Sequence, residues 1–129
     1  MRKRIAVPCA LLALAGGVVL FPPPASSQQE ELDPVKIAAD THKLVFENQF
    51  LRVIQAKVPA GGIEPKHKHP KGVTVYMTDY TIEQRSLPGG NWTRGDRRFG
   101  AVTWSDAVVH EVRNIGKTPS HALRIELKY

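Results

Sequence analysis

Cysteine is almost absent from this chain: its 129 residues include one, Cys9, near the N-terminus. A single cysteine excludes a disulfide within the chain, and loss of the segment around it would exclude a cysteine nucleophile as well. The sequence after that segment also lacks any stretch with helical periodicity over three turns, and it has no internal repeat. These absences favour a β fold that is stabilised by packing rather than by covalent links.

Excess charge is small as well. The formal net charge is +6 at pH 7, and three of the basic residues lie at positions 2–4. Without them, 15 basic residues face 12 acidic ones, a net charge of +3. This balance is ordinary for a soluble domain, so we expect no nucleic-acid partner.

One apolar run is present, at the N-terminus. Residues 2–4 are basic, residues 5–20 are apolar, and small residues follow a proline-rich break at 25–27. This pattern is typical of a secretory signal peptide, and we expect residues 1–27 to be cleaved after Ser27. The protein would then be secreted or periplasmic and would keep no stable membrane span. An uncleaved anchor is the alternative, although the run is at the short limit for crossing a bilayer.

After the signal peptide we expect a polar leader at residues 28–41 and one domain at residues 42–129. In that domain, short runs rich in β-branched residues alternate with turns that contain Gly, Pro and Asn. The predicted strands are 43–46, 51–58, 63–69, 73–78, 80–87, 100–104, 108–113 and 122–127, with a less regular segment at 92–99. Strands of this number and length predict an all-β sandwich or barrel.

Two histidines lie one residue apart in one of these predicted strands. Because strand side chains alternate, His67 and His69 project from the same face, close enough to hold one metal ion. His110 lies in a later strand that antiparallel folding could bring alongside. Three imidazoles and water can hold zinc, iron, copper, nickel or manganese. The plainer interpretation is a solvated patch of lysine and histidine at residues 66–71.

The spacing of these residues resembles the two motifs of the cupin superfamily. Gly61, His67 and His69 match the first motif, and His110 and Asn114 match the end of the second. The resemblance covers nearly the whole expected domain. It implies an all-β double-stranded β-helix, the jelly-roll barrel of the small single-domain cupins, with a metal ion held by the three histidines. Dimers are common in that family, so the resemblance also implies a homodimer as one expected state.

The glutamate of the first cupin motif is missing. Its position falls on Val73 or Thr74, and neither residue carries a carboxylate. The identity of the metal therefore stays open among iron, zinc, manganese, nickel and copper. With less charge neutralised, the ion should favour an anionic ligand or a more acidic bound water. Glu64 is a candidate replacement, but in a regular strand it would face away from His67.

The same question decides the orientation of Tyr76. If Thr74 takes the glutamate position, Tyr76 looks into the cavity and becomes a candidate catalytic proton donor or a substrate clamp. If Val73 takes it, Tyr76 faces outward and is structural. Two histidines lie outside the motifs: we expect His42 at the surface and His121 in a buried, hydrogen-bonded position.

For the remaining polar residues we expect structural or surface roles. Asn114 should fix the turn at Gly116 rather than contact a ligand. Arg94, Arg97 and Arg98 form a cationic segment that we expect to be solvated, with recognition of an acidic ligand as the alternative. No nucleophile elbow is present, so the sequence does not indicate a serine hydrolase.

Two classes of function remain open. One class is a metalloenzyme that acts on a small, anionic molecule, and the resemblance implies dioxygenase, isomerase, lyase or decarboxylase chemistry for it. The other class is a non-catalytic module that binds or senses a small molecule, in which a metal is structural or absent. One fold hosts many chemistries, so the site must decide between them.

Overall fold

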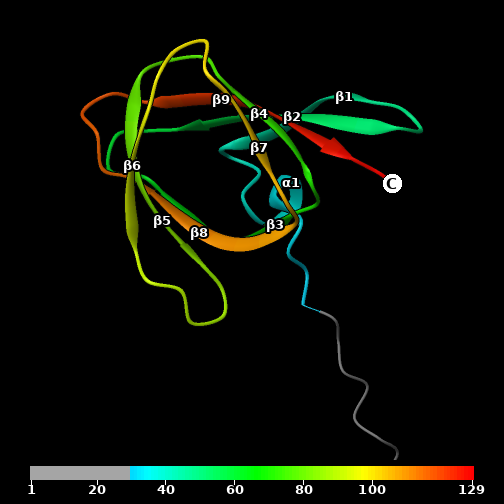
Figure 1. The fold of residues 1–129 in the computed structure, drawn as a ribbon, viewed down its shortest axis with the longest axis horizontal. Helices are drawn as coiled ribbons and strands as arrows, with labels where there is room; N and C mark the ends of the chain where they lie inside the picture. The colour runs from blue at the N-terminus through cyan, green and yellow to red at the C-terminus, as the bar shows by residue number, and fades with distance from the viewer. Residues whose placement is uncertain (1–29) are drawn as a thin grey trace, which may run out of the picture.

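The computed structural model describes residues 30–129, which form nine strands and one short helix (Figure 1). The elements are α1 (Pro34–Ile37), β1 (His42–Glu47), β2 (Leu51–Val58), β3 (Ile63–His69), β4 (Gly72–Tyr76), β5 (Tyr80–Ser86), β6 (Thr93–Arg97), β7 (Val102–Ser105), β8 (Val108–Asn114) and β9 (Ser120–Leu127). The expected signal peptide lies outside the described residues. No helix in the described part of the chain is long and apolar enough to cross a membrane.

The strands form two antiparallel sheets that face each other. One sheet has the order β1-β2-β9-β4-β7 and the other the order β3-β8-β5-β6. Figure 1 shows the two sheets curving around a common interior. The prediction of an all-β jelly roll is therefore confirmed. The turn between β2 and β3 contains Gly61, whose φ of 75° lies in the left-handed region that glycine adopts at least cost.

Asn114 joins the two sheets at one end of the barrel. Its side-chain amide donates to the carbonyl of Val58 at 3.0 Å and to that of Thr118 at 2.9 Å. Its Oδ1 accepts from the backbone N–H of Gly116 at 3.0 Å, which confirms the predicted role in that turn. Because Val58 ends β2 and Asn114 ends β8, this buried side chain links a strand of one sheet to a strand of the other.

The segment before β1, which we expected to be a polar leader, packs against the barrel. Asp33 caps α1 by accepting from the N–H of Val35 at 3.2 Å, and its carboxylate pairs with Arg52 on β2 at 3.0 Å. The carbonyl of Leu32 accepts from the N–H of Lys68 on β3 at 2.9 Å. The described part of the leader is thus attached to both sheets, and it fixes where β1 begins.

The barrel interior is polar at its centre. Strand β9 turns Ser120, Ala122, Arg124 and Glu126 inward, and all four are buried. Its other residues face outward. His121 is hydrogen-bonded to Gln55 as expected of a histidine with a partner, but it is half-buried on the outer face and not in the interior.

An apolar row crosses the outer face of the five-stranded sheet. Phe46 pairs with Val53, Val53 with Ile125, Ile125 with Val73, and Val73 with Trp104. The row therefore takes one residue from each strand, in the order of the sheet. Its two ends are open to solvent, with Phe46 53% exposed and Trp104 55% exposed.

Candidate metal centre

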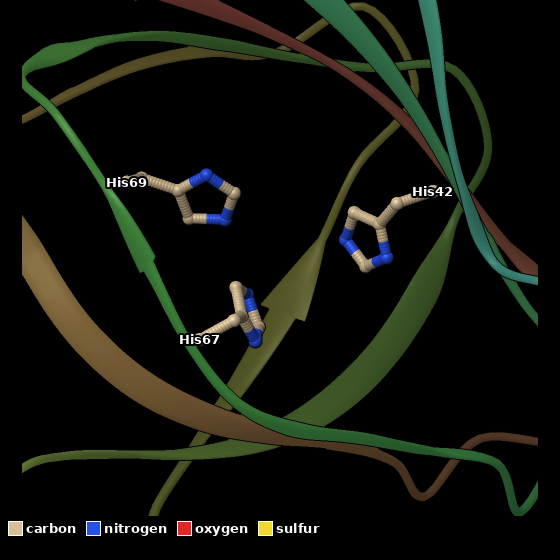
Figure 2. Close-up of side chains that lie close together, drawn as sticks. All are labelled: His42, His67 and His69. Carbon is tan, nitrogen blue, oxygen red and sulfur yellow. The ribbon is translucent and has the colours of Figure 1, made fainter. Parts of the chain in front are cut away.

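Four histidines meet inside the barrel. His67 and His69 come from β3, His110 from β8 and His42 from β1. The ring centroid of His67 lies 4.8 Å from that of His69, 4.4 Å from that of His110 and 5.4 Å from that of His42. Figure 2 shows His42, His67 and His69 pointing toward one another from β1 and β3. The structure brings together all three predicted ligands and adds a fourth histidine.

Strand pairing explains how two of these residues meet. His67 lies directly opposite His110 in the antiparallel β3–β8 pair, so both side chains leave the same face of that sheet. His42 reaches the same interior from the other sheet, at the first residue of β1. The expectation that His42 lies at the surface is wrong, since it is 2% exposed. The helical turn before it, packed on the barrel, places the start of β1 over the interior.

Hydrogen bonds fix the rings of the two β3 histidines. Nδ1 of His67 donates to the carbonyl of Pro65 at 2.6 Å, and Nδ1 of His69 donates to Oε1 of Glu126 at 2.5 Å. Each bond places the proton on Nδ1, so that Nε2 carries the lone pair. This is the arrangement of a metal-ligating histidine, whose other ring nitrogen is held by a carbonyl or a carboxylate.

His42 is held in the same way. The hydroxyl of Thr41 donates to the carbonyl of Ala38 at 3.1 Å and accepts from Nδ1 of His42 at 3.0 Å. Three imidazoles therefore share one tautomer, and the ligand atoms of His42, His67 and His69 lie within 4.8 Å of one another. Ordinary Zn–N bonds are about 2.0–2.1 Å, so the rings would have to move toward one another to share one ion.

His110 stands at the edge of this group. Its Nε2 lies 2.9 Å from Nε2 of His67. Burial, followed by the neighbouring histidines, lowers the pKa of His110 to about 2. The same causes lower the pKa values of His42 and His67 to about 4. All three imidazoles are therefore neutral at neutral pH, which is the form that binds metal ions.

Glu64 also faces the histidines, against the prediction from strand parity. The pairing of β3 with β8 shifts register between Glu64 and His67, so a β-bulge inserts one extra residue there. The carboxylate consequently lies 3.7 Å from Nε2 of His67 and 3.9 Å from Nε2 of His42. Burial raises the pKa of Glu64 to about 7. A carboxylate is thus available beside the imidazoles.

A cavity of about 530 Å³ opens beside the histidines. Thr74 and Tyr76 line it, whereas Val73 belongs to the outer apolar row. Of the two alternatives for the missing glutamate position, Thr74 is therefore the one that faces inward. The Tyr76 hydroxyl is 2.9 Å from Oγ1 of Thr103, and its ring meets the edge of Tyr80 at a centroid distance of 5.9 Å.

The arginines near β6 separate into two kinds. Arg94 and Arg98 are exposed and lie 3.9 Å from Asp96 and 3.4 Å from Asp79, as a solvated segment predicts. Arg97 lines the cavity, and its guanidinium lies over the Tyr76 ring at 5.5 Å from the centroid.

Sequence reasoning missed His42 and Glu126 and discounted Glu64. Pro65 was an available signal for the bulge beside Glu64, because proline inside a strand often marks one. Asp33 followed by Pro34 is a helix-start signal that would have ordered the segment before His42. For Glu126 no comparable signal exists, since a carboxylate on a strand is usually solvated.

No family model and no curated protein matches this chain. Solved structures do match it. A cupin domain from Bordetella pertussis Tohama I superposes with a TM-score of 0.63 at 24% identity, over 68% of this chain and 92% of that one. An RmlC-like cupin family protein with a double-stranded β-helix fold from Methanocaldococcus jannaschii gives a TM-score of 0.54 at 10% identity, over 67% and 77%.

A third structure, a cupin superfamily protein from Desulfitobacterium hafniense DCB-2, gives a TM-score of 0.50 at 11% identity, over 67% of this chain and 74% of that one. The chain has the cupin fold. The double-stranded β-helix implied by its two sequence motifs is therefore confirmed. Within this cupin barrel, His42 and Glu64 belong to neither of the matched motifs. Both lie beside His67 and so add an imidazole and a carboxylate to the motif histidines.

Proposed function

We propose that this cupin binds one divalent transition metal ion at the histidine cluster and binds or converts a small, anionic molecule in the adjoining cavity. The observation that carries the proposal is the shared tautomer of His42, His67 and His69. Each Nδ1 is occupied by a protein acceptor, and the three ligand atoms come within 4.8 Å of one another. Isolated core histidines have no reason to share this arrangement.

The donor set suits iron, zinc, manganese, nickel or copper. Neutral imidazole nitrogens and one carboxylate are typical ligands of these ions, whereas calcium and magnesium prefer oxygen. His67 and His69 belong to every ligand set that we consider. The third imidazole is either His110, as the family resemblance implies, or His42, which the cluster geometry favours.

The residues around the cluster have separable roles in this proposal. A bound ion would supply a Lewis acid for an oxygen atom of the ligand. Glu126 orients the ring of His69, and Glu64 and Tyr76 both line the cavity. These two groups can hold or release a proton next to a bound molecule, so they favour an enzyme.

The second candidate function is non-catalytic binding or sensing of the same kind of molecule. The hydroxyl of Tyr76 is already bonded to Thr103, an arrangement that suits a ligand contact as well as proton transfer. Turnover assays of the metal-loaded protein across small organic acids separate the two functions. Tight binding without turnover supports the binding module.

Metal binding itself is tested by elemental analysis of natively purified protein and by Zn²⁺ titration against a competing chelator. We expect one ion per chain and losses of affinity above about 100-fold in His67→Ala and His69→Ala, more than the loss of an orienting residue would cause. His42→Ala and His110→Ala identify the third ligand. His121→Ala, on the outer face, is the matched control. A wild-type protein that binds no more Zn²⁺ than His67→Ala contradicts the proposal.

We also propose that the protein is exported. The basic, apolar and small-residue order of residues 1–27 supports this, and mass spectrometry of the protein from its host should give a mature N-terminus at Gln28. A homodimer through the outer apolar row is the further part of the proposal. Apolar side chains across a whole sheet face are a typical contact surface between protein chains.

A further inference from the structure

A buried arginine faces the cavity without an acidic partner. Arg124, on the inner face of β9, is 6% exposed and lines the cavity. Its Nη1 donates to Oγ1 of Thr74 at 3.2 Å and to Oγ of Ser105 at 2.7 Å, and its Nη2 donates to the carbonyl of Pro70 at 2.6 Å. All three acceptors are uncharged. Its Nε has no hydrogen-bond partner within residues 30–129.

In the described part of the chain, Arg124 has no carboxylate within ion-pair distance, although the charge of Glu126 attracts it from further away. Glu126 lies two residues further along the same inner face, but its carboxylate is bonded to Arg52 and to His69. None of the ion pairs among residues 30–129 includes Arg124. A buried cation without a direct ion-pair partner is costly, and protein structures normally provide one. The geometry is therefore that of a site in which an anion from outside the chain completes the pairing.

Three N–H groups of the guanidinium are used and two of its five remain, one of them on Nε. Nη1 and Nη2 are held by fixed oxygens, so the orientation of the group is set before any ligand arrives. A guanidinium held in this way can recognise a planar carboxylate with little loss of side-chain entropy. Arg85, another cavity residue, is already paired with Glu111 at 2.6 Å.

The rest of the wall indicates the body of the ligand. Tyr80, Ile82, Val112 and Ala122 line the cavity and present apolar surface. Thr74 and Ser105 are bonded to Arg124, and the hydroxyls of Tyr76, Thr103 and Ser120 also line the cavity. A cavity of about 530 Å³ that combines this apolar surface with the buried guanidinium of Arg124 suits a small ligand whose charge is at one end.

We propose that the cavity binds a small organic carboxylate, with its carboxylate on Arg124 and its apolar body against Ile82 and Val112, next to the histidine cluster. The inference names the ligand class of the function proposed above, and it rests on that function only for the contact between the ligand and a metal ion. The pairing with Arg124 itself needs no metal. One buried cation matches a carboxylate, whose single charge it balances, better than a phosphate.

Calorimetric titration of the full-length protein with benzoate, and with neutral benzamide of the same shape, tests this inference. We expect wild-type protein to bind benzoate at least about tenfold more tightly than benzamide, the size of one charge-assisted interaction. Arg124→Gln should remove this preference, and Arg124→Lys should keep part of it. Arg113→Gln, an arginine stacked on the Trp92 ring at 3.8 Å outside the barrel, should leave it unchanged.

Equal binding of the two compounds by the wild-type protein would overturn the inference, and this result needs no variant. A preference that survives in Arg124→Gln, or that disappears in Arg97→Gln and not in Arg124→Gln, would also overturn it. Circular dichroism checks that each variant is folded.

The titrations are run on chelator-treated protein and on Zn²⁺-loaded protein. If the protein fails to bind Zn²⁺ but chelator-treated protein still prefers benzoate in a way that depends on Arg124, the proposed metal function is wrong and this inference is supported. If the protein binds Zn²⁺ as expected but shows no preference for benzoate, the metal function is supported and this inference is overturned.

Discussion

The carboxylate of Glu64 lies 3.7 Å from Nε2 of His67, although both residues belong to β3 and are three positions apart. In a regular strand such residues face opposite sides of the sheet. The bulge between them turns Glu64 inward and leaves it buried. A carboxylate therefore reaches the histidines from the start of β3, while the expected motif position on β4 holds Thr74.

Replacing Glu126 by glutamine should weaken metal binding without removing a ligand. Glu126 is 1% exposed, and it accepts from Nδ1 of His69 and from Arg52. Loss of its charge should free the His69 ring to change tautomer and lower Zn²⁺ affinity by about 10- to 100-fold. Chelator competition measures this change. Glu83→Gln, which removes an ion pair with Arg113 outside the cavity, serves as control, and an equal effect in both variants would refute the orienting role.

Asn114→Ala should destabilise the whole barrel. The side chain is 2% exposed and makes three hydrogen bonds, two of them as a donor to carbonyls at the end of the barrel. Its loss leaves buried backbone groups without partners, so we expect the free energy of unfolding to fall by about 3 kcal/mol. Urea denaturation provides the measurement, and Asn91→Ala in an exposed loop is the control. A change below about 1 kcal/mol would show that the link is dispensable.

The ion pair between Asp33 and Arg52 should make stability depend on pH at the acidic end. Burial raises the pKa of Asp33, but the hydrogen bonds from Arg52 and from the Val35 N–H outweigh it and leave the pKa below its ordinary value of 3.8. Because the folded pKa is the lower one, the carboxylate stabilises the fold fully above the unfolded pKa. This contribution is lost as the pH falls through the folded pKa.

Asp33→Asn isolates the effect, because asparagine caps a helix as well as aspartate does. At pH 7 we expect the variant to lose about 1 kcal/mol of unfolding free energy, the upper range for a partly exposed pair. Below the folded pKa of Asp33 the two proteins should converge. Denaturation series at several pH values measure this difference, and a gap that is constant with pH would mean that the charge of Asp33 contributes nothing.

The outer apolar row should mediate self-association. Phe46→Glu and Trp104→Glu alter residues that are more than half exposed, so both variants should fold normally. We expect the wild-type protein to be a dimer by size-exclusion chromatography with light scattering, and both variants to be monomers. Phe99→Glu, at a residue that is 71% exposed and outside the row, should remain dimeric. A monomeric wild-type protein would contradict the homodimer.

Much of the fold could be predicted from the sequence. Strands β2 and β3 occur at the predicted residues 51–58 and 63–69, because alternating side chains end there at proline and glycine turns. The pairing of His67 with His110 follows from antiparallel folding of two strand patterns. The cupin motifs added the order in which these strands assemble.

The facing of individual residues could not be predicted as well. Strand periodicity misplaced Glu64, because a bulge breaks the alternation on which the rule depends. On β9 the usual rule of apolar residues inside is reversed: Arg124 and Glu126 face inward, while Ile125 lies in the outer row. Local sequence cannot reveal this inversion. Arg124 and Glu126 face inward because their partners, such as His69, Thr74 and Ser105, come from strands that are distant in the sequence.

His42 has a consequence for processing of the polypeptide. It is supplied by the first residue of β1, which directly follows the docked segment around Asp33 and α1. A protease that cut just after His42 would take away one imidazole and spare the two motif strands. The cleavage proposed after Ser27 lies well before this residue, so the exported protein would keep the imidazole of His42.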